Sequence, residues 1–428
     1  RLDPTRRSKP SEPKTESLLF YMNNNNRKRR PSGSKQQGNG TFNPRSRKPS
    51  RGKNGGGRKA STLDPSLLVR KATGVTVESY RSSRTIEDLP VDERIIQCLL
   101  KKGFTHPTEI QDKTIEHLLA HRDVLGIAQT GTGKTGAFLI PIIQDLLRQP
   151  KKPFALILVP TRELATQVEE EFKSMTKGLN LFSACFIGGT NINRDLQNLR
   201  RPSHVIIATP GRLLDLVSRK MIDLRVINTL VLDEFDRMLD MGFEKDVMRI
   251  ISGMRARQQS LLFSATLDNS QRRLIDEILN EPVTVKVSSG DTTGDHIDQD
   301  IIRLNPGEDK LNVLTGLISD ESYEKVLVFE ETKRRVSKLC KQLNQLGIES
   351  EEIHGNKSQN ARQTALNKFK AGKVRVLVAT DVASRGIDVS DVTHVINYEV
   401  PQTFDSYIHR IGRTGRAGRK GMALTFVS

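Results

Sequence analysis

The sequence predicts an α/β protein with two tandem domains, each built around a doubly wound parallel sheet. Short apolar runs rich in β-branched residues alternate with amphipathic helical stretches from about residue 85 onward. The alternation occurs twice, on either side of a polar, glycine-containing break at residues 287–300. Strands and helices that alternate in this way favour parallel sheets with helical crossovers.

Each half of this pattern supplies its own strands and helices. In the first half the expected strands are Val124–Ile127, Phe154–Val159, Val205–Ala208, Leu230–Leu232 and Leu261–Phe263, with helices such as Lys134–Leu147 and Glu163–Met175. In the second half they are Val326–Phe329, Val374–Val378, His394–Asn397 and Met422–Phe426, with helices such as Lys333–Leu346 and Gln359–Phe369. We therefore place the domains at residues 85–286 and 299–428 and expect ligands at the carboxyl ends of the strands.

Residues 1–84 differ from the rest in composition and charge. They are rich in Asn, Gly, Ser, Pro, Lys and Arg, and they hold 21 Lys/Arg against 5 Asp/Glu of a chain whose net charge is +18. Such a segment buries too little apolar surface to offset its ordering entropy, so a disordered tail is expected. We favour a salt-sensitive arm that gathers RNA. A solubilising tail and a nuclear address at Arg27–Arg30 are the alternatives.

Several classes of protein are excluded by composition. The three cysteines, Cys98, Cys185 and Cys340, match no metal-ligand spacing and indicate a reducing compartment. Apolar runs fall short of the roughly 18 residues that a membrane helix needs, so no membrane partner is expected. A cytoplasmic location is expected, with the nucleus open for a eukaryotic protein.

A phosphate-binding loop is the strongest local motif. Residues 128–135 read AQTGTGKT, and they follow a predicted strand and open a predicted helix. Glycines let backbone N–H groups surround phosphates, and the helix N-terminus adds a positive dipole. The expected nucleotide contacts are Gln129, Thr130, Gly131, Thr132, Gly133, Lys134 and Thr135. Lys134 would contact the β- and γ-phosphates, and the Thr135 hydroxyl would ligate Mg²⁺.

An acidic pair follows the apolar strand about a hundred residues later. Asp233 and Glu234 end the run VLDE. Asp233 would hold Mg²⁺ through water, and Glu234 would orient and polarise the attacking water. An acidic cluster alone is usually a solvated turn, but its position after a phosphate loop favours a catalytic role.

Taken together, these segments resemble the DEAD-box RNA helicases over about residues 85–428. The resemblance implies two RecA-like domains, ATP and Mg²⁺ as ligands, and single-stranded or short duplex RNA as partner. The segment GFTHPTEIQ at residues 103–111 is similar to the adenine-reading motif of the family. Gln111 would bond the adenine edge, and the family's stacking Phe corresponds to Ile86 here.

Further matches imply contacts to RNA and a coupling element. In the first domain the implied RNA contacts are Thr161, Arg162, Gly189, Thr209 and Arg212, and in the second Arg362, Thr380 and Arg385. Singly, each would be a turn or a helix cap. Ser264 and Thr266 match the segment that couples ATP turnover to strand separation, with hydroxyls able to bond Asp236 and His409. Phe329 lies in the fourth motif of the family, and Asp388 would reach the ribose.

The stretch YIHRIGRTGR at residues 407–416 implies arginine fingers. Arg413 and Arg416 are spaced to share one helix face and would point at the γ-phosphate, with His409 beside them. A basic loop that binds phosphate without specificity is the alternative.

One residue departs from the motif that names the family. Phe235 stands where the family has Ala, and overpacking of this size can cost ~1–3 kcal/mol. Either Phe235 fills a matching pocket and activity survives, which we favour, or the ATPase is impaired and the protein clamps RNA. We thus expect a monomeric, RNA-stimulated ATPase that unwinds short duplexes, with a DNA helicase and an RNA clamp as competing hypotheses.

Overall fold

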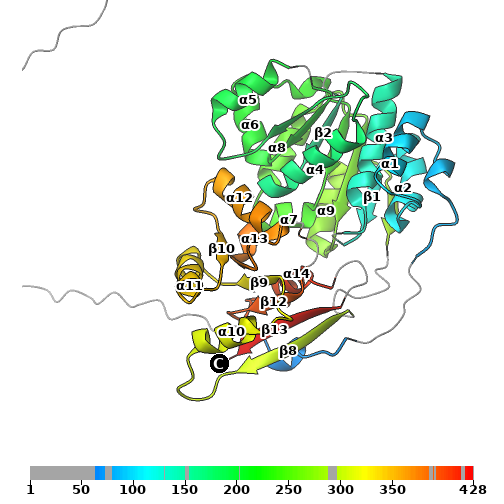
Figure 1. Cartoon of the computed structure of the whole chain (residues 1–428). Coiled ribbons are helices and arrows are strands. Elements are labelled where there is room, and N and C mark those ends of the chain that lie inside the picture. The colour runs from blue at the N-terminus through cyan, green and yellow to red at the C-terminus, as the bar shows by residue number, and fades with distance from the viewer. Residues whose placement is uncertain are drawn as a thin grey trace, which may run out of the picture. The chain divides into compact units, whose positions relative to one another are not determined.

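The computed structural model describes residues 63–72, 80–129, 131–149, 154–201, 203–287, 296–384, 389, 392–415 and 420–427. Two α/β units, each with its own sheet, account for most of them (Figure 1). The disorder expected for the first 62 residues lies outside the described residues.

The first unit contains a seven-stranded sheet in the order β3-β4-β2-β5-β6-β1-β7. Every pair of neighbouring strands is parallel. The strands are β1 (Val124–Ile127), β2 (Ala155–Leu158), β3 (Ser183–Phe186), β4 (Val205–Ala208), β5 (Thr229–Leu232), β6 (Gln259–Ser264) and β7 (Val283–Lys286). The central strands β2, β4, β5 and β6 are buried along their whole length, as a sheet covered on both faces requires.

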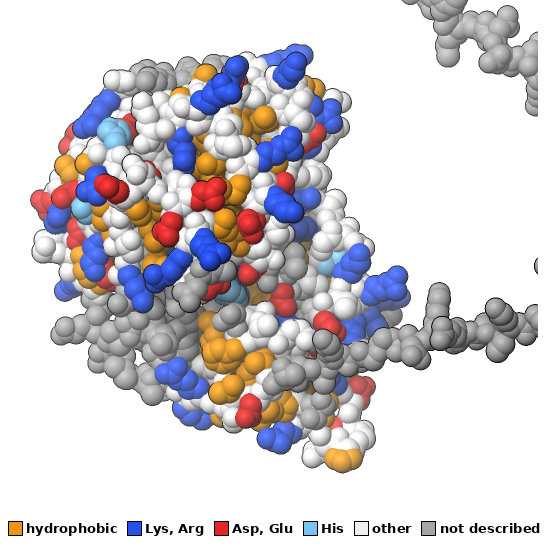
Figure 2. All heavy atoms as spheres, turned by 180° about the vertical axis from the view of Figure 1, so that it is seen from behind, with side chains coloured by type: hydrophobic (Ala, Val, Ile, Leu, Met, Phe, Trp, Pro, Cys, Tyr) orange, Lys and Arg blue, Asp and Glu red, His pale blue; other side chains and the backbone are white. Residues whose placement is uncertain are grey.

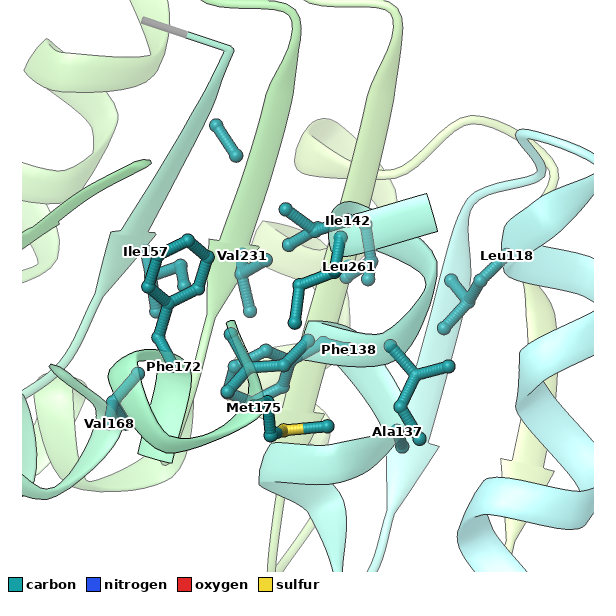
Figure 3. Packing of buried hydrophobic residues seen from close by; sticks show 14 of the residues in the cluster. Leu118, Ala137, Phe138, Ile142, Ile157, Val168, Phe172, Met175, Val231 and Leu261 are labelled. Carbon is teal, nitrogen blue, oxygen red and sulfur yellow. The ribbon is translucent and has the colours of Figure 1, made fainter. Parts of the chain in front are cut away.

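Helices cover both faces of this sheet. They are η2 (Ile86–Asp88), α1 (Glu93–Lys101), α2 (Glu109–Leu119), α3 (Lys134–Arg148), α4 (Arg162–Met175), α5 (Ile192–Leu199), α6 (Pro210–Ser218), η3 (Leu224–Val226), α7 (Phe235–Asp240), α8 (Glu244–Gly253) and α9 (Asn269–Ile278). Two separate apolar cores result, one beneath α1 to α4 and the other beneath α6 to α9. In the first core Phe138 of α3 packs against Phe263 of β6, with ring centroids 5.6 Å apart. Figure 3 shows Phe138 of α3 in the same core as Phe172 of α4 and Leu261 of β6.

The second unit repeats this architecture with six strands, in the order β10-β11-β9-β12-β13-β8 and all parallel. The strands are β8 (Ile297–Arg303), β9 (Val326–Phe329), β10 (Ser350–Ile353), β11 (Val376–Ala379), β12 (His394–Asn397) and β13 (Gly421–Val427). The helices are α10 (Lys310–Ser319), α11 (Lys333–Gln345), α12 (Gln359–Lys370), α13 (Asp381–Ser384) and α14 (Phe404–Ile411).

The fold class predicted from the sequence is confirmed, and all nine expected strands are present with ends shifted by at most two residues. Four strands were not expected: β3, β7, β8 and β10. All four carry partly buried or exposed positions, and β8 and β10 also contain acidic side chains. Periodicity therefore found the buried strands and missed the outer ones.

Two expectations about boundaries need correction. The polar break expected at residues 287–300 ends earlier, because β8 begins at Ile297 and pairs with β13 along its whole length. The tail expected at residues 1–84 also ends earlier, because η1 (Pro65–Leu68) and residues 80–84 make specific contacts with the two units. Both segments adjoin polar stretches of the sequence, and long-range contacts order them.

The surface of the described units mixes both signs of charge. On the face seen in Figure 2, Lys and Arg side chains alternate with Asp and Glu side chains rather than forming one continuous basic area. None of the described helices combines the length and the apolar character needed to traverse a bilayer.

Candidate functional site

Apart from Gln111, which lies on α2, the predicted site residues of the first unit lie at or just after the carboxyl ends of six neighbouring strands. The order of the sheet divides them into two groups. The loops after β1 and β5 carry residues expected to bind nucleotide and metal, and the loop after β6, next to both, carries the expected coupling segment; we call this the nucleotide half. The loops after β3, β4 and β2 carry those expected to contact RNA, and we call this the RNA half.

In the nucleotide half, the phosphate loop joins β1 to α3. Gly131 and Gly133 have φ values of 87° and 93°, a conformation that glycine adopts without steric strain. Lys134 begins α3 and is 6% exposed, and its Nζ donates to the carbonyl of Ala128 at 2.9 Å. The ammonium is thus held across the loop that it helps to form. Thr130 lies outside the described residues.

The segment expected to read adenine packs against this loop. Gln111 donates through Nε2 to the carbonyl of Gly133 at 2.9 Å and accepts from the backbone of Thr108 at 3.0 Å. A Cβ added to Gly133 would lie 2.8 Å from Nε2 of Gln111, so only glycine permits this approach. The structure therefore joins Gln111 directly to the phosphate loop, a contact that the sequence did not indicate.

Asp233 and Glu234 follow β5 and are both buried, at 2% and 5% exposure. Burial raises the pKa of Asp233 to about 6, and the nearby Lys134 ammonium partly offsets this rise. Glu234 has a φ of 54°, which is uncommon for a residue with a side chain. Its Oε2 lies 3.2 Å from the guanidinium of Arg237, so a buried cation holds the carboxylate in place.

A divalent cation fits these residues. The Oδ1 atom of Asp233 is buried and accepts no hydrogen bond from any described residue. Thr135 adds a hydroxyl in the first turn of α3. No group of three or more His, Cys, Asp or Glu side chains suited to a metal occurs among the described residues. This donor set matches Mg²⁺, which binds through few protein oxygens and takes its other ligands from water and phosphate.

The coupling segment after β6 is tied to the acidic motif. Asp236 accepts through Oδ2 from the backbone N–H groups of Ala265 and Thr266 and from the Thr266 hydroxyl, each at 3.2 Å. The expectation that Ser264 also bonds Asp236 is corrected, because its hydroxyl donates to the carbonyl of Thr266 at 2.6 Å. Ser264 is the last residue of β6, and its hydroxyl bonds within the loop that follows this strand.

Two departures from the family pattern are accommodated within the cores. Phe235 is 1% exposed and packs in the core beneath α6 to α9. Its volume therefore fills an apolar pocket and does not enter the phosphate site. Ile86 is likewise 1% exposed and belongs to the other core, while its N–H donates to the carbonyl of Thr105 at 3.0 Å.

In the RNA half, an arginine covers a pair of glycines. A Cβ added to Gly189 would lie 2.2 Å from the Arg162 guanidinium, so that side chain lies directly on the backbone after β3. Thr161 caps α4 by accepting from the N–H of Leu164, and the Thr209 hydroxyl accepts from the N–H of Gly188.

Arg212 completes this half and is fixed by carboxylates. Its Nε lies 2.8 Å from Asp195, which is itself 2% exposed, and Nη1 lies 3.3 Å from Asp215. The guanidinium also donates to the carbonyl of Thr190. Arg212 is thus preorganised at the edge of the sheet where Gly188 and Gly189 lie.

In the second unit, Arg362 and Thr380 are both buried, at 8% and 9% exposure. Arg362 donates to the carbonyl of Ala383 at 3.2 Å and forms an ion pair with Glu163 at 3.0 Å. Burial lowers the pKa of Arg362, and Glu163 opposes that shift. Gln359 donates to the same carboxylate at 3.0 Å, so α12 presents two donors to one acid.

Helix α14 carries a buried arginine whose partners come from three segments. Arg410 donates to Asp381 through Nη2 at 2.8 Å, to Asn397 at 3.1 Å and to the carbonyl of Glu399 at 2.8 Å. Its guanidinium also lies 5.1 Å from the ring centroid of Phe329. Arg410 thereby holds together the carboxyl ends of β9, β11 and β12.

The expected arginine fingers are arranged differently from the prediction. Helix α14 ends at Ile411, so Arg413 lies beyond it and the shared helix face does not exist. Gly412 caps the helix and Gly415 has a φ of 66°, which ends the helical path. Arg413 itself is 5% exposed. Arg416, Arg385 and Asp388 lie outside the described residues, and His409 is on α14.

Sequence reasoning missed several residues of these networks. Arg237, Glu163, Asp381 and Arg410 each bond a predicted site residue or join two motifs, yet none was chosen as a candidate. These residues could have been found in the sequence because they lie inside or beside the motifs that match the family. Their pairing partners lie up to about two hundred residues away, and charge pattern alone does not select among them.

Comparison with known families and proteins agrees with this arrangement. The sequence model described as DEAD/DEAH box helicase matches residues 108–274, and that of the helicase conserved C-terminal domain matches residues 309–418. The DEAD-box ATP-dependent RNA helicase CshA of Bacillus licheniformis is 44% identical over 344 residues, covering 80% of this chain and 70% of that protein. CshA of Geobacillus kaustophilus is also 44% identical, covering 80% and 73%.

Solved structures show the same architecture. Dbp5 of S. cerevisiae, bound to RNA and ADP BeF3, aligns with a TM-score of 0.72 and 32% identity, covering 81% of this chain and 90% of that chain. The DEAD-box helicase Mss116, bound to ssRNA and UDP-BeF, aligns with a TM-score of 0.73 and 31% identity, covering 81% and 76%.

Proposed function

Since this chain belongs to the DEAD-box ATP-dependent RNA helicases, we propose that it hydrolyses ATP in the nucleotide half of the first sheet and grips RNA in the RNA half. The chain is an ATP-hydrolysing RNA helicase. What remains to be assigned is the task of each residue.

One observation carries the proposal most directly. The buried acids Asp233 and Glu234 and the phosphate loop occupy one half of a single sheet edge, and the fixed arginines occupy the other half. Both ligands would then be bound by loops of one hydrogen-bonded sheet, in which β2 of the RNA half pairs with β5 of the nucleotide half, so a change in one half would reach the other without a separate relay.

We assign phosphate binding to the loop after β1. The N–H groups of the first turn of α3 and the Lys134 ammonium supply positive charge for the β- and γ-phosphates. Gln111 would bond the adenine edge once it exchanges its contact with Gly133. Thr135 and Asp233 would hold Mg²⁺, which when bound neutralises charge on the phosphates and positions them.

Glu234 is the proposed general base. Its carboxylate is buried beside Asp233 and paired with Arg237, so it is held in one place for an attacking water. A placed base of this kind contributes about 10²- to 10⁴-fold to a rate. Asp236 lies two residues after Glu234 and bonds the loop that carries Thr266, so a change at the phosphates would move the end of β6 as well.

The second unit would supply cations to the nucleotide. Arg410 fixes the end of α14 through its bond to Asp381. The buried Arg413, which follows this helix, is the proposed finger that stabilises charge on the γ-phosphate. Arg416, Asp388, Arg385 and His409 remain proposals from the family pattern, for finger, ribose, RNA and coupling contacts. Thr380 and Arg362 would face RNA phosphates, Arg362 after releasing Glu163.

We infer that RNA is bound through its backbone. Backbone amides, threonine hydroxyls and arginines recognise phosphate and sugar and carry little sequence information. Contacts to 2′-hydroxyls would favour RNA over DNA. We further propose that the two domains span residues 85–286 and the residues from β8 to 428. We propose that the protein acts as a monomer and is located in the cytoplasm. The location is consistent with the three cysteines, which match no metal or disulfide framework.

The test is steady-state ATP hydrolysis by the full chain with single-stranded RNA or single-stranded DNA of equal length. RNA is expected to stimulate turnover and DNA to do so weakly. Equal stimulation by both would favour a DNA-directed helicase. No turnover with either, restored by Phe235→Ala, would favour an RNA clamp.

A further inference from the structure

The segment that precedes the first unit is docked on the second unit. The backbones of Arg70 and Gln299 exchange two hydrogen bonds, of 3.0 and 2.7 Å, as an antiparallel bridge. The N–H of Ala72 also donates to the Asp298 carboxylate at 2.9 Å. Gln299 belongs to β8, which ends the six-stranded sheet, so the segment pairs with an edge that would otherwise be open.

One side chain of the segment is inserted into the apolar interior. Leu68 is fully buried, whereas its neighbours Leu67 and Val69 are 55% and 44% exposed. The pocket of Leu68 is formed by residues of β8, β13 and α14, namely Ile297, Tyr407, Ile411, Ala423 and Val427. A single buried leucine between two exposed apolar residues identifies a specific docking contact rather than general collapse.

The pocket is closed by the helix that leads into Arg413. Tyr407 of α14 is fully buried, and its hydroxyl donates to the carbonyl of Leu68 at 3.3 Å and to Oε1 of Gln299 at 3.0 Å. One turn further along α14, Arg410 makes its contacts with Asp381 and Asn397. The docked segment thus contacts the same buried helix that organises the arginines.

We propose that residues 63–72 form an intramolecular strap whose Leu68 acts, through Tyr407, as a positioning residue for α14 and the arginine segment after it. The proposal rests on the proposed function, since it is the position of Arg410 and Arg413 that would limit turnover. Removing Leu68 would leave a cavity against Tyr407 and Ile411, and packed interiors respond to such a loss by shifting the helix.

The test compares Leu68→Asp with the matched control Leu67→Asp in the full chain. Leu68→Asp is expected to lower kcat at saturating RNA and ATP by roughly tenfold, since small misplacements of catalytic groups are costly. Both KM values should change less than about twofold, and Leu67→Asp should behave as wild type. Leu68→Met should restore turnover. Nucleotide sites are counted in each preparation, so that kcat per site excludes loss of folded protein.

Hydrogen exchange provides the structural readout. The Gln299 N–H should be protected in wild type and in Leu67→Asp, and exposed in Leu68→Asp. Arg70→Pro, which removes the N–H that donates to Gln299, should repeat the loss without altering the apolar contact, with Lys71→Pro as its control.

Three outcomes would overturn the strap. Rapid exchange at Gln299 in wild type would show that the segment is not docked. Lost protection with kcat retained in Leu68→Asp would show that docking does not position α14. Equal kcat losses in Leu67→Asp and Leu68→Asp would remove the role of the pocket. A wild-type chain without RNA-stimulated hydrolysis would instead overturn the proposed function and the role in turnover, while the exchange data would still decide docking.

Discussion

The two α/β units differ in the buried charges that dominate near the carboxyl ends of their strands. In the first unit, the loops after β5 bury Asp233, Glu234 and Asp236. In the second unit, the loops after β11 and β12 meet the buried Arg410 and Arg362. The scaffolds are alike, because both sheets are parallel and carry their polar groups at the carboxyl ends of strands. A shared fold therefore does not fix the charge of its site.

The two units stabilise their buried charges in different ways. Arg410 donates to three acceptors from two segments, so its charge is compensated within the protein. Asp233 keeps a buried oxygen without a partner among the described residues, so its charge requires something from outside. The second unit is thus preorganised by its own contacts, and the first is completed by what it binds. Each prediction below tests one side of this contrast.

The largest effect is expected at the base of the first unit. Glu234→Gln removes the proton acceptor and keeps the shape, so turnover should fall by about 10²-fold or more. Steady-state hydrolysis with saturating RNA measures this. Glu244→Gln, at an exposed position on α8, is the control and should leave turnover unchanged. Retained activity in Glu234→Gln would remove the catalytic assignment of the buried acids.

A large loss of stability is expected in the second unit when Arg410 is replaced by Ala. The change leaves Asp381 and Asn397 without their buried cation, and breaking such a network costs about 3–5 kcal/mol. Chemical denaturation measures the free energy of unfolding of this unit. Arg334→Ala, at an exposed position on α11, should change it little. Equal effects of the two substitutions would deny that the second unit is organised by its arginine.

The opposite sign is expected in the first unit for Asp233→Asn. The folded pKa of Asp233 is raised to about 6 by burial, above its ordinary value of 3.8, so the folded state disfavours the ionised form. The wild type therefore loses stability relative to the Asn variant as the pH rises from about 4 to 6. Above that range Asn should stabilise the metal-free protein by on the order of 2 kcal/mol.

Thermal unfolding in a chelator, from pH 4 to pH 8, measures this difference. Asp240→Asn, at an exposed position on α7, serves as the control. The same Asp233→Asn variant should be inactive, so stability and function would move in opposite directions. A destabilised Asn variant at pH 8 would mean that the charge of Asp233 is already compensated within the protein.

The smallest effect concerns the segment before both units. Residues 1–62 hold 17 Lys/Arg and 3 Asp/Glu. Removing them while retaining residues 63–72 should weaken RNA binding and reduce the slope of log K against log salt concentration, because fewer counterions are released. Basal hydrolysis should not change. Fluorescence anisotropy at several salt concentrations measures the slope, and an unchanged slope would assign RNA binding to the two units alone.

The sequence alone determined the buried strands of the two sheets, the phosphate loop and the acids that follow β5. These features depend on neighbours along the chain. Residues 128–135 need only a strand before them and a helix after them, and Asp233 needs only an apolar strand to precede it. The same local logic predicted that Phe235 could fill a pocket, although only the packed core identified that pocket.

Tertiary structure decided the contacts between distant segments. Whether Arg413 lies on a helix depended on where α14 ends. The residues around Gly412 are compatible in sequence both with a helix that continues and with one that stops there. The bond of Gln111 to Gly133, the pairing of Glu163 with Arg362 and the docking of Leu68 behind Tyr407 all join residues far apart in the chain. The local sequence pattern indicates which groups need a partner. The identity of the partner depends on how the complete sheet packs against its helices, and a short stretch of sequence does not contain that information.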